Sequence, residues 1–293
     1  MLEVVWDMET QDPDDYLTLL LLLGHPEVHL KAVTITPGST DQVGLVRQAL
    51  AWFGQQLPVG AHNLAHPRSC VSPWHHQAYG RIVPSSDAEP GGEVLLRSCD
   101  EQTTLITGGP LKNLGDALRL NKLRGENAFR LGRLVAQGGF AGEGVMPRER
   151  QLDKFKGMTH CPTYNLNGDP ASALEILRFP GVGVRRFVSK NVCHGVWYDR
   201  EMHLRFEAVK DNSLSLELIW KGMNTYLSRQ PAGKKFHDPL TACCAIDESI
   251  GTWAQVELYR AKGAWGSRLS PGSRTWIITG YDHDRFVRTL TAY

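Results

Sequence analysis

The sequence predicts an α/β protein whose core is an open, mostly parallel β-sheet with crossover helices. Short β-branched segments alternate with segments of helical apolar spacing, and turns rich in Asp, Gly or Pro separate them. The chain has 293 residues, 42% of them hydrophobic, and is long enough to bury a large core. It shows neither an internal repeat nor a stretch typical of a linker, so we expect residues 1–293 to form a single domain.

The N-terminal part carries the first two repeats of this alternation. Residues 2–6 are a short apolar strand, and a Leu-rich helix over residues 16–23 follows an acidic turn. Residues 28–36 are β-branched and predict a second strand, after which residues 41–54 have helical apolar spacing. Strand, helix, strand and helix in this rhythm favour parallel strands joined by crossover helices.

The same alternation returns in the second third of the chain. We expect further strands and helices at residues 104–107, 111–120, 133–137, 169–177 and 182–188. The segments 84–92, rich in Pro, Gly and Ser, and 146–156, rich in charge, are predicted to be surface loops. In open parallel sheets, ligands bind beyond the carboxyl ends of the strands, so the turns that follow these strands are the candidate site.

Charge and cysteine content narrow the class of protein. The formal net charge is +1, which favours neither nucleic acid nor an anionic membrane as a partner. The six cysteines show no C-x-x-C pairing, so we expect buried thiols in a reducing compartment and neither disulfides nor zinc. With no signal-like segment and no apolar run of membrane-spanning length, the expected location is cytoplasmic.

An acidic cluster follows the first strand. Its members are Asp7, Glu9, Asp12, Asp14 and Asp15. Carboxylates packed this closely repel one another unless a cation compensates them, and all-oxygen ligands suit a hard cation such as Ca²⁺ or Mg²⁺. Aspartates also cap helices, which could account for one or two of the five. A Ca²⁺ site usually takes six to eight oxygens, so further ligands must come from elsewhere in the chain.

A second polar turn offers such a ligand. Asp238 lies in the segment His237-Asp238-Pro239-Leu240, immediately before an apolar stretch. It could equally be the cap of that helix, and His237 could be an ordinary loop histidine. An acid and an imidazole together at the start of a helix indicate a functional site only weakly. They become a stronger indication when other motifs of the same kind of site occur elsewhere in the chain.

Seven segments in order along the chain resemble motifs of the nucleoside hydrolase (inosine-uridine preferring) family. They are Asp7–Asp15 (D-x-D-P-G-x-D-D in the family), Ala32–Gly38 (its second strand), Gly109–Leu114 (G-P-L-T-N-I), Gln137–Phe140 (M-G-G), Tyr164–Pro170 (F-N-x-x-x-D-P), Asn191–His194 (D-V-T-H) and His237–Leu240 (H-D-P-L). Each segment alone is a weak match, but the ordered set covers nearly the whole chain.

The resemblance implies a Rossmann-like fold with helices on both faces of the sheet and a Ca²⁺ ion at the floor of a pocket. It implies hydrolysis of the N-glycosidic bond of a nucleoside or related N-riboside, in a homodimer or homotetramer. Asp15 and Asp238 would be Ca²⁺ ligands together with a backbone carbonyl of Gly108 or Thr107. Asp14 and Asn165 would bind the sugar, and His237 would lie over the base and help to protonate it.

This chain departs from the family pattern at several positions. Glu9 stands where aspartate is usual, which makes it our candidate general base and metal ligand, with Asp7 and Asp12 as possible substitutes. Ser39 and Thr163, candidate substrate-binding residues, stand where asparagine and glutamate are frequent. Gly157 also replaces an asparagine, so ordinary ribonucleoside specificity does not follow from the resemblance.

Two alternatives remain open from sequence. The segment 148–160 carries the basic residues Arg148, Arg150, Lys154, Lys156 and His160. It is either a solvated charged loop or a binding site for the 5′-phosphate of a nucleoside monophosphate. The altered motif positions also allow a non-catalytic relative that binds Ca²⁺ and sugar without turnover.

Overall fold

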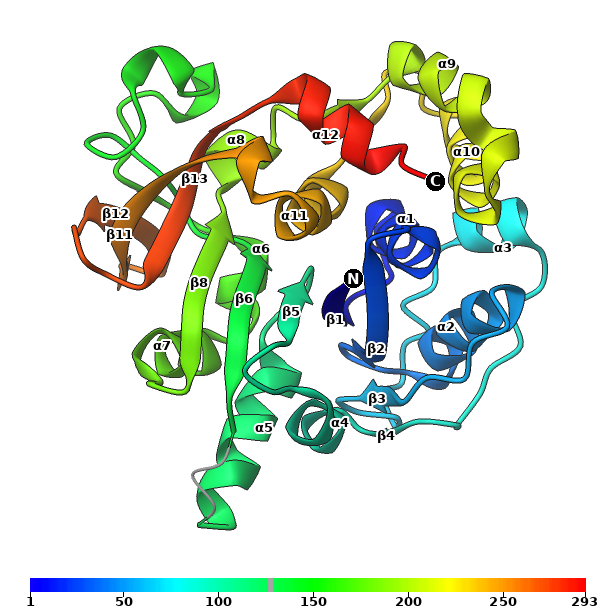
Figure 1. Cartoon of the computed structure of the whole chain (residues 1–293), viewed down its shortest axis with the longest axis horizontal. Helices are drawn as coiled ribbons and strands as arrows, with labels where there is room; N and C mark the ends of the chain where they lie inside the picture. Colours follow the sequence, from blue (N-terminus) through cyan, green and yellow to red (C-terminus); the bar gives the residue numbers. More distant parts are fainter. Residues whose placement is uncertain (126–128) are drawn as a thin grey trace.

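The computed structural model describes residues 1–125 and 129–293, and these contain an 11-stranded mixed sheet (Figure 1). In spatial order its strands are β4 (Glu89–Pro90), β3 (Val59–Ala61), β2 (Val28–Ile35), β1 (Leu2–Met8), β5 (Thr104–Thr107), β6 (Leu131–Gln137), β8 (Val182–Val188), β13 (Thr275–Tyr281), β11 (Gly251–Ala261), β12 (Ala264–Leu269) and β7 (His160–Cys161). From β4 to β13 all neighbouring strands are parallel. Strands β11, β12 and β7 extend this sheet in antiparallel fashion. The predicted fold class is therefore confirmed, with an antiparallel edge that the sequence analysis does not include.

The core of the sheet is apolar on both faces. Val4, Val5 and Trp6 of β1 are fully buried, as are Leu105 and Ile106 of the neighbouring β5. A strand covered by helices on both sides reads as a continuous apolar run rather than an alternating one. This explains why a segment of only a few residues at the N-terminus is recognisable as the central strand.

Helices cover the sheet on two sides (Figure 1). One layer contains α1 (Pro13–Gly24), α2 (Thr40–Trp52) and α11 (His237–Ile246). The other contains α4 (Gly91–Ser98), α5 (Lys112–Leu123) and α7 (Pro170–Arg178), which pack on one another. The chain runs outward from β1 through β2 and β3, then returns to β5 on the opposite side of β1 and continues the other way. The gap between the carboxyl ends of β1 and β5 is therefore the topological switch point of the sheet, where ligands bind in open α/β folds.

The remaining elements are short or peripheral. They are α3 (Pro73–Tyr79), α6 (Tyr164–Gly168), α8 (Lys190–Cys193), α9 (Arg200–Val209), α10 (Leu214–Leu227), α12 (His283–Leu290), the ribbon β9 (Trp197–Tyr198) with β10 (Lys234–Lys235), and four 3₁₀ turns at Arg148–Arg150, Asp153–Phe155, Lys210–Asn212 and Glu248–Ile250.

The prediction of a surface loop over residues 84–92 is wrong at its C-terminal end, because β4 begins at Glu89 and α4 at Gly91. The first two residues of α4 are glycines, which have low helix propensity, so the sequence does not indicate that a helix begins there.

All six cysteines are free thiols, four of them buried, as the sequence predicts. Within the described ranges, no helix is long and apolar enough to cross a lipid bilayer.

Candidate metal centre and active site

Three elements meet at the switch point, two of them consecutive in sequence and the third near the other end of the chain. The end of β1 brings Asp7 and Glu9, the first turn of α1 brings Asp14 and Asp15, and the first turn of α11 brings Asp238. Asp7 pairs in register with Thr107 of β5, so the turn after β5 lies beside the turn after β1. The sequence segments that resemble family motifs thus converge on one edge of the sheet.

A compact group of three buried carboxylates forms the floor of this site. One carboxylate oxygen from each of Asp14, Asp15 and Asp238 lies within 4.8 Å of the others, and all three residues are buried. Burial, followed by repulsion between carboxylates, raises the pKa of Asp15 and that of Asp238 well above their usual range. A cation beside these carboxylates would offset their repulsion, and an all-oxygen donor set fits a hard divalent ion such as Ca²⁺.

Asp14 differs from the other two because a lysine ammonium of the protein pairs with it. Its Oδ1 lies 2.9 Å from the ammonium of Lys234, and its Oδ2 accepts hydrogen bonds from the backbone amides of His237 and Asp238. Burial works to raise the pKa of Asp14, but the positive charges of Lys234 and His237 outweigh it, and the pKa is lowered. Asp14 therefore joins α1 to the amino end of α11 and is held as an ionised carboxylate.

Lys234 is a site residue that the sequence analysis missed. It lies on β10, and its ammonium contacts both Asp14 and Asp12 at 2.9 Å. The side chain of Asp12 is 58% exposed and turned to this lysine, so Asp12 is not part of the three-carboxylate group. Lys234 stands three residues before the His237 motif, and nothing in its own sequence context marks it as buried.

Asp7 and Glu9, the two candidates for the general base, occupy different environments. Asp7 is fully buried, and its Oδ1 accepts hydrogen bonds from Thr34 (2.7 Å) and Asn113 (2.8 Å). Burial raises its pKa to about 6 despite these two hydrogen bonds. Glu9 instead lines the cavity above the carboxylate group, where burial and then repulsion from Asp7 raise its pKa to about 7. Of the two, Glu9 is the carboxylate that a ligand can reach.

The turn after β5 brings a backbone carbonyl to the site. The side-chain amide of Asn165 donates to the carbonyl of Gly108 at 2.9 Å and to the side chain of Gln137 at 2.7 Å. A Cβ atom at Gly108 would lie 2.7 Å from an oxygen of Asp238, so glycine is required for this close approach. Gln137 is a second residue absent from the sequence prediction, although its motif Gln137–Phe140 was recognised.

Two histidines line the opposite wall of the same cavity. The rings of His237 and His194 lie 4.9 Å apart, and Nδ1 of His237 is buried with no hydrogen-bond partner. Burial lowers the pKa of His237, and burial with the positive charges of His237 and Lys154 lowers that of His194 to about 3. Both rings are therefore neutral near pH 7. The role of His194 was not predicted, although it ends a recognised motif.

Other predicted residues lie in less direct positions. Thr163 is 3% exposed, lines the cavity, and its hydroxyl has no hydrogen-bond partner. Ser39 caps α2 and donates its hydroxyl to the carbonyl of Ser69, so its side chain serves the local fold and does not line the cavity. Of the basic loop 148–160, only Lys154 comes near the site, with its ammonium 2.8 Å from His194.

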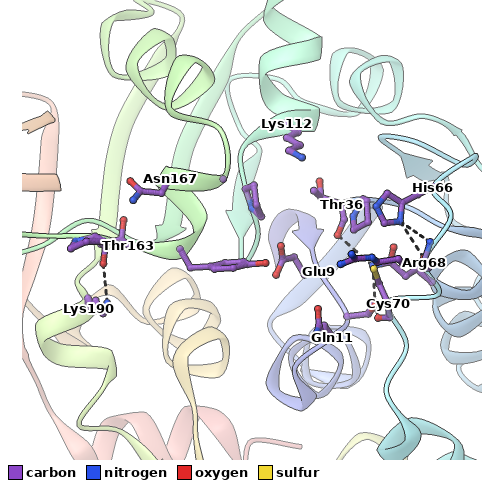
Figure 2. Close-up of a pocket in the computed structure, with 17 residues that line it drawn as sticks. Glu9, Gln11, Thr36, His66, Arg68, Cys70, Lys112, Thr163, Asn167 and Lys190 are labelled. Carbon is purple, nitrogen blue, oxygen red and sulfur yellow. Dashed lines mark hydrogen bonds between the residues drawn. The ribbon is translucent and has the colours of Figure 1, made fainter. Parts of the chain in front are cut away.

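Two cavities adjoin at this edge of the sheet. The first, the acidic cavity of about 590 Å³, lies over the three carboxylates and is walled by His194 and His237. The second, of about 690 Å³, lies beyond Glu9 and is the one drawn in Figure 2. Either volume falls in the range that a ligand of nucleoside size requires.

Comparison with known proteins agrees with this geometry. A sequence model described as inosine-uridine preferring nucleoside hydrolase matches residues 4–288. The chain belongs to this family of N-glycosyl nucleoside hydrolases. The search of curated protein sequences found no match.

Solved structures match the fold at low identity. An inosine-uridine preferring nucleoside hydrolase from Bacillus anthracis is 19% identical with a TM-score of 0.70, covering 99% of this chain and 98% of that one. A plant nucleoside hydrolase is 16% identical with a TM-score of 0.69, covering 99% and 97%. A purine-preferring ribonucleoside hydrolase from Gardnerella vaginalis is 14% identical with a TM-score of 0.65, covering 99% and 96%. At this identity the structures establish the nucleoside hydrolase fold.

Proposed function

We propose that this protein hydrolyses the N-glycosidic bond of a nucleoside or related N-riboside in a reaction that depends on Ca²⁺. The observation that carries the proposal is the buried group Asp14, Asp15 and Asp238 at the switch point of a nucleoside hydrolase fold. Lys234 pairs with only one of these three carboxylates, Asp14, and a divalent cation would balance the charge of the other two. The cavity above them has the volume for a nucleoside.

The residues that would hold the ion are Asp15 and Asp238, with the Gly108 carbonyl beside them. When bound there, Ca²⁺ would supply a contact for sugar hydroxyls and a lowered pKa for a water molecule. Asp14 is kept ionised by Lys234, so it can accept a hydrogen bond from a sugar hydroxyl. The clustered carboxylates also stabilise the positive charge that develops on the sugar as the bond to the base breaks.

Glu9 is the proposed general base. It reaches the cavity, and a pKa raised to about 7 matches the proton affinity that a base needs at neutral pH. Asp7 lies behind it, fully buried and hydrogen-bonded to Thr34 and Asn113. The negative charge of Asp7 helps to raise the pKa of Glu9, so we assign Asp7 a supporting role and Glu9 the proton transfer.

His237 and His194 are proposed to contact the departing base. Both rings are neutral, so a ring N–H can donate a hydrogen bond to a base nitrogen as it gains electrons from the broken bond. The ring of His237 lines the cavity, and its Nδ1 has no hydrogen-bond partner among the described residues. The ammonium of Lys154 next to His194 is a nearby source of a proton.

The test is release of free base from a panel of ribonucleosides, deoxyribonucleosides and their 5′-monophosphates, with Ca²⁺ or with a chelator. We expect release from at least one member, lost in chelator and restored by added Ca²⁺. Asp15→Asn should lower kcat/KM by about a hundredfold or more, whereas the exposed Asp12→Asn should lower it far less. Tight Ca²⁺ binding without release from any member would favour the non-catalytic relative instead.

A further inference from the structure

The second cavity has a charge opposite to that of the acidic cavity. Among the described residues that line it, Arg68, Lys112 and Lys190 are cationic, and Glu9 is the one carboxylate. Within residues 1–125 and 129–293, none of these three cations forms a salt bridge, and the ammonium of Lys190 donates a hydrogen bond to the backbone carbonyl of Pro162 at 2.8 Å. We call this space the basic cavity. Unpaired cations around a concave space favour an anionic ligand.

The two cavities form one continuous site. Both are lined by Glu9, Gln11, Thr163, Tyr164 and Lys190. Figure 2 shows His66 and Arg68 on one side of the basic cavity, Thr163 and Lys190 on the other, and Glu9 between them. A ligand that fills both spaces must offer hydroxyls at the carboxylate end and negative charge at the other.

The loop that carries Arg68 is fixed to the body of the protein. The hydroxyl of Thr10, in the turn after β1, donates to the carbonyl of Cys70 at 2.6 Å. Ser39 donates to the carbonyl of Ser69 at the same distance, and the backbone amide of Arg68 donates to the ring of His66 at 3.3 Å. The loop that carries Arg68 is thus hydrogen-bonded to the turn after β1 and to the start of α2, which lowers the entropy cost of ordering its backbone around a ligand.

Two further features suit an anion. Lys112 is the first residue of the 12-residue helix α5, and this end of the helix lines the cavity with Pro110, so backbone and side chain both contribute positive potential. Thr163 lines both cavities, is 3% exposed, and its hydroxyl has no partner within the described protein. A buried hydroxyl without a partner is costly, and a ligand oxygen at the junction of the cavities would satisfy it.

We propose that the basic cavity binds a phosphate carried by the sugar, so that the preferred substrate is a nucleoside 5′-monophosphate. This inference rests on the proposed function, because it assigns the sugar to the acidic cavity. Arg68 and Lys112 bind the phosphate oxygens, Lys190 neutralises charge at the junction, and Thr163 donates a hydrogen bond there. The predicted loop 148–160 is not the phosphate site, because its basic residues line neither cavity and Lys156 pairs with Asp153.

The deciding measurement is binding of ribose 5-phosphate, ribose and inorganic phosphate to the Ca²⁺-loaded protein by calorimetry. We expect ribose 5-phosphate to bind about tenfold or more tightly than ribose, and added salt to weaken only the phosphate-bearing ligands. Lys112→Gln and Arg68→Gln should each remove most of that preference, measured as the ratio of the two affinities in the same variant. Arg229→Gln, at an exposed position remote from both cavities, is the matched control.

Equal affinity for ribose and ribose 5-phosphate, or a preference that survives both substitutions, overturns the inference. Competition by inorganic phosphate against ribose 5-phosphate but not against ribose supports it and places the anion in the basic cavity. The proposed function fails separately, if no member of the substrate panel releases base. Base release that is indifferent to the 5′-phosphate leaves the proposed function standing and removes this inference alone.

Discussion

The ammonium of Lys234 lies 2.9 Å from a carboxylate oxygen of Asp14, and the two side chains are only 7% and 2% exposed. This buried pair joins the short ribbon β9–β10 to the first turn of α1 and keeps one of the three clustered carboxylates ionised. Asp14 is therefore neutralised by a lysine and can bind a ligand, whereas Asp15 and Asp238 have no cationic side chain paired with them among the described residues and can bind an ion.

Removing the lysine should destabilise the protein. We expect Lys234→Met to lower the free energy of unfolding by about 3 kcal/mol in chelator, because Asp14 is left buried and unpaired. Added Ca²⁺ should stabilise this variant more than the parent protein, since the ion gains a third free carboxylate. Urea unfolding with and without Ca²⁺ measures both effects, and the exposed Lys221→Met is the control. A loss no larger than that of the control would contradict the buried pair.

Replacing an ion ligand should have the opposite effect on the metal-free protein. Asp238→Asn removes one of two facing carboxylates whose pKa values are both raised by burial and mutual repulsion. We expect about 1 kcal/mol of added stability in chelator, a rise in Tm on the order of 3 °C, and loss of the further rise on adding Ca²⁺. Thermal unfolding checks this, and Asp12→Asn should keep the Ca²⁺ response. A Ca²⁺ response that persists in Asp238→Asn would place the ion elsewhere.

The turn after β5 should tolerate no side chain. In Gly108→Ala the new Cβ would meet Asp238 at 2.7 Å and Trp6 at 2.6 Å. We expect a cost of about 2 kcal/mol in stability and at least a roughly tenfold loss of Ca²⁺ affinity, because the Asp238 carboxylate must move. Calcium titration measures the second effect. Gly195→Ala, whose Cβ would have ordinary contacts at 3.4 Å, should behave like the parent, and equal affinity in both variants would refute the argument.

His75 should make stability fall in mild acid. It is fully buried beside the ring of Tyr16, and burial lowers its pKa from 6.5 to about 4. Above pH 6.5 the ring is neutral in both the folded and unfolded states, so it adds no pH dependence. Between pH 6.5 and about 4 only the unfolded chain takes up the proton, which removes up to about 3 kcal/mol of stability.

The substitution His75→Asn keeps an acceptor for the Ser72 amide but cannot titrate. Its free energy of unfolding should therefore fall less steeply than that of the parent when urea unfolding is repeated from pH 7 to pH 4.5. His76→Asn, at the exposed neighbouring position, should leave the profile as it is. Parallel profiles for the parent and His75→Asn would show that the acid sensitivity has another source.

Much of the fold could be predicted because its parallel strands are buried on both faces. The strands over 2–6, 28–36, 104–107, 133–137 and 182–188 all exist within a residue or two of their predicted ends. The C-terminal strands β11, β12 and β13 were not predicted. Exposed residues interrupt β11 and β12, β13 ends in partly exposed residues, and β11 mixes polar with apolar residues. Pairing of β12 with β7 depends on a contact between distant segments, which local patterns do not encode.

The site residues that could be predicted from the sequence are those that lie in recognisable motifs. Asp14, Asp15 and Asp238 meet as expected, because each begins a helix that the apolar pattern reveals. Lys234 could not be predicted, because only its pairing with Asp14 in the folded structure shows that this lysine is buried. Ser39 resembles a ligand contact in sequence but caps α2 in the structure, because a serine before Gln42 also satisfies a capping box.

The bond between Asp14 and the amide of His237 spans 223 residues. On a ribosome, α1 emerges early, and Asp14 is made long before Lys234 and the amides of His237 and Asp238 that will pair with it. Helix α1, which is rich in buried leucines, therefore spends much of synthesis next to a turn whose carboxylates repel one another.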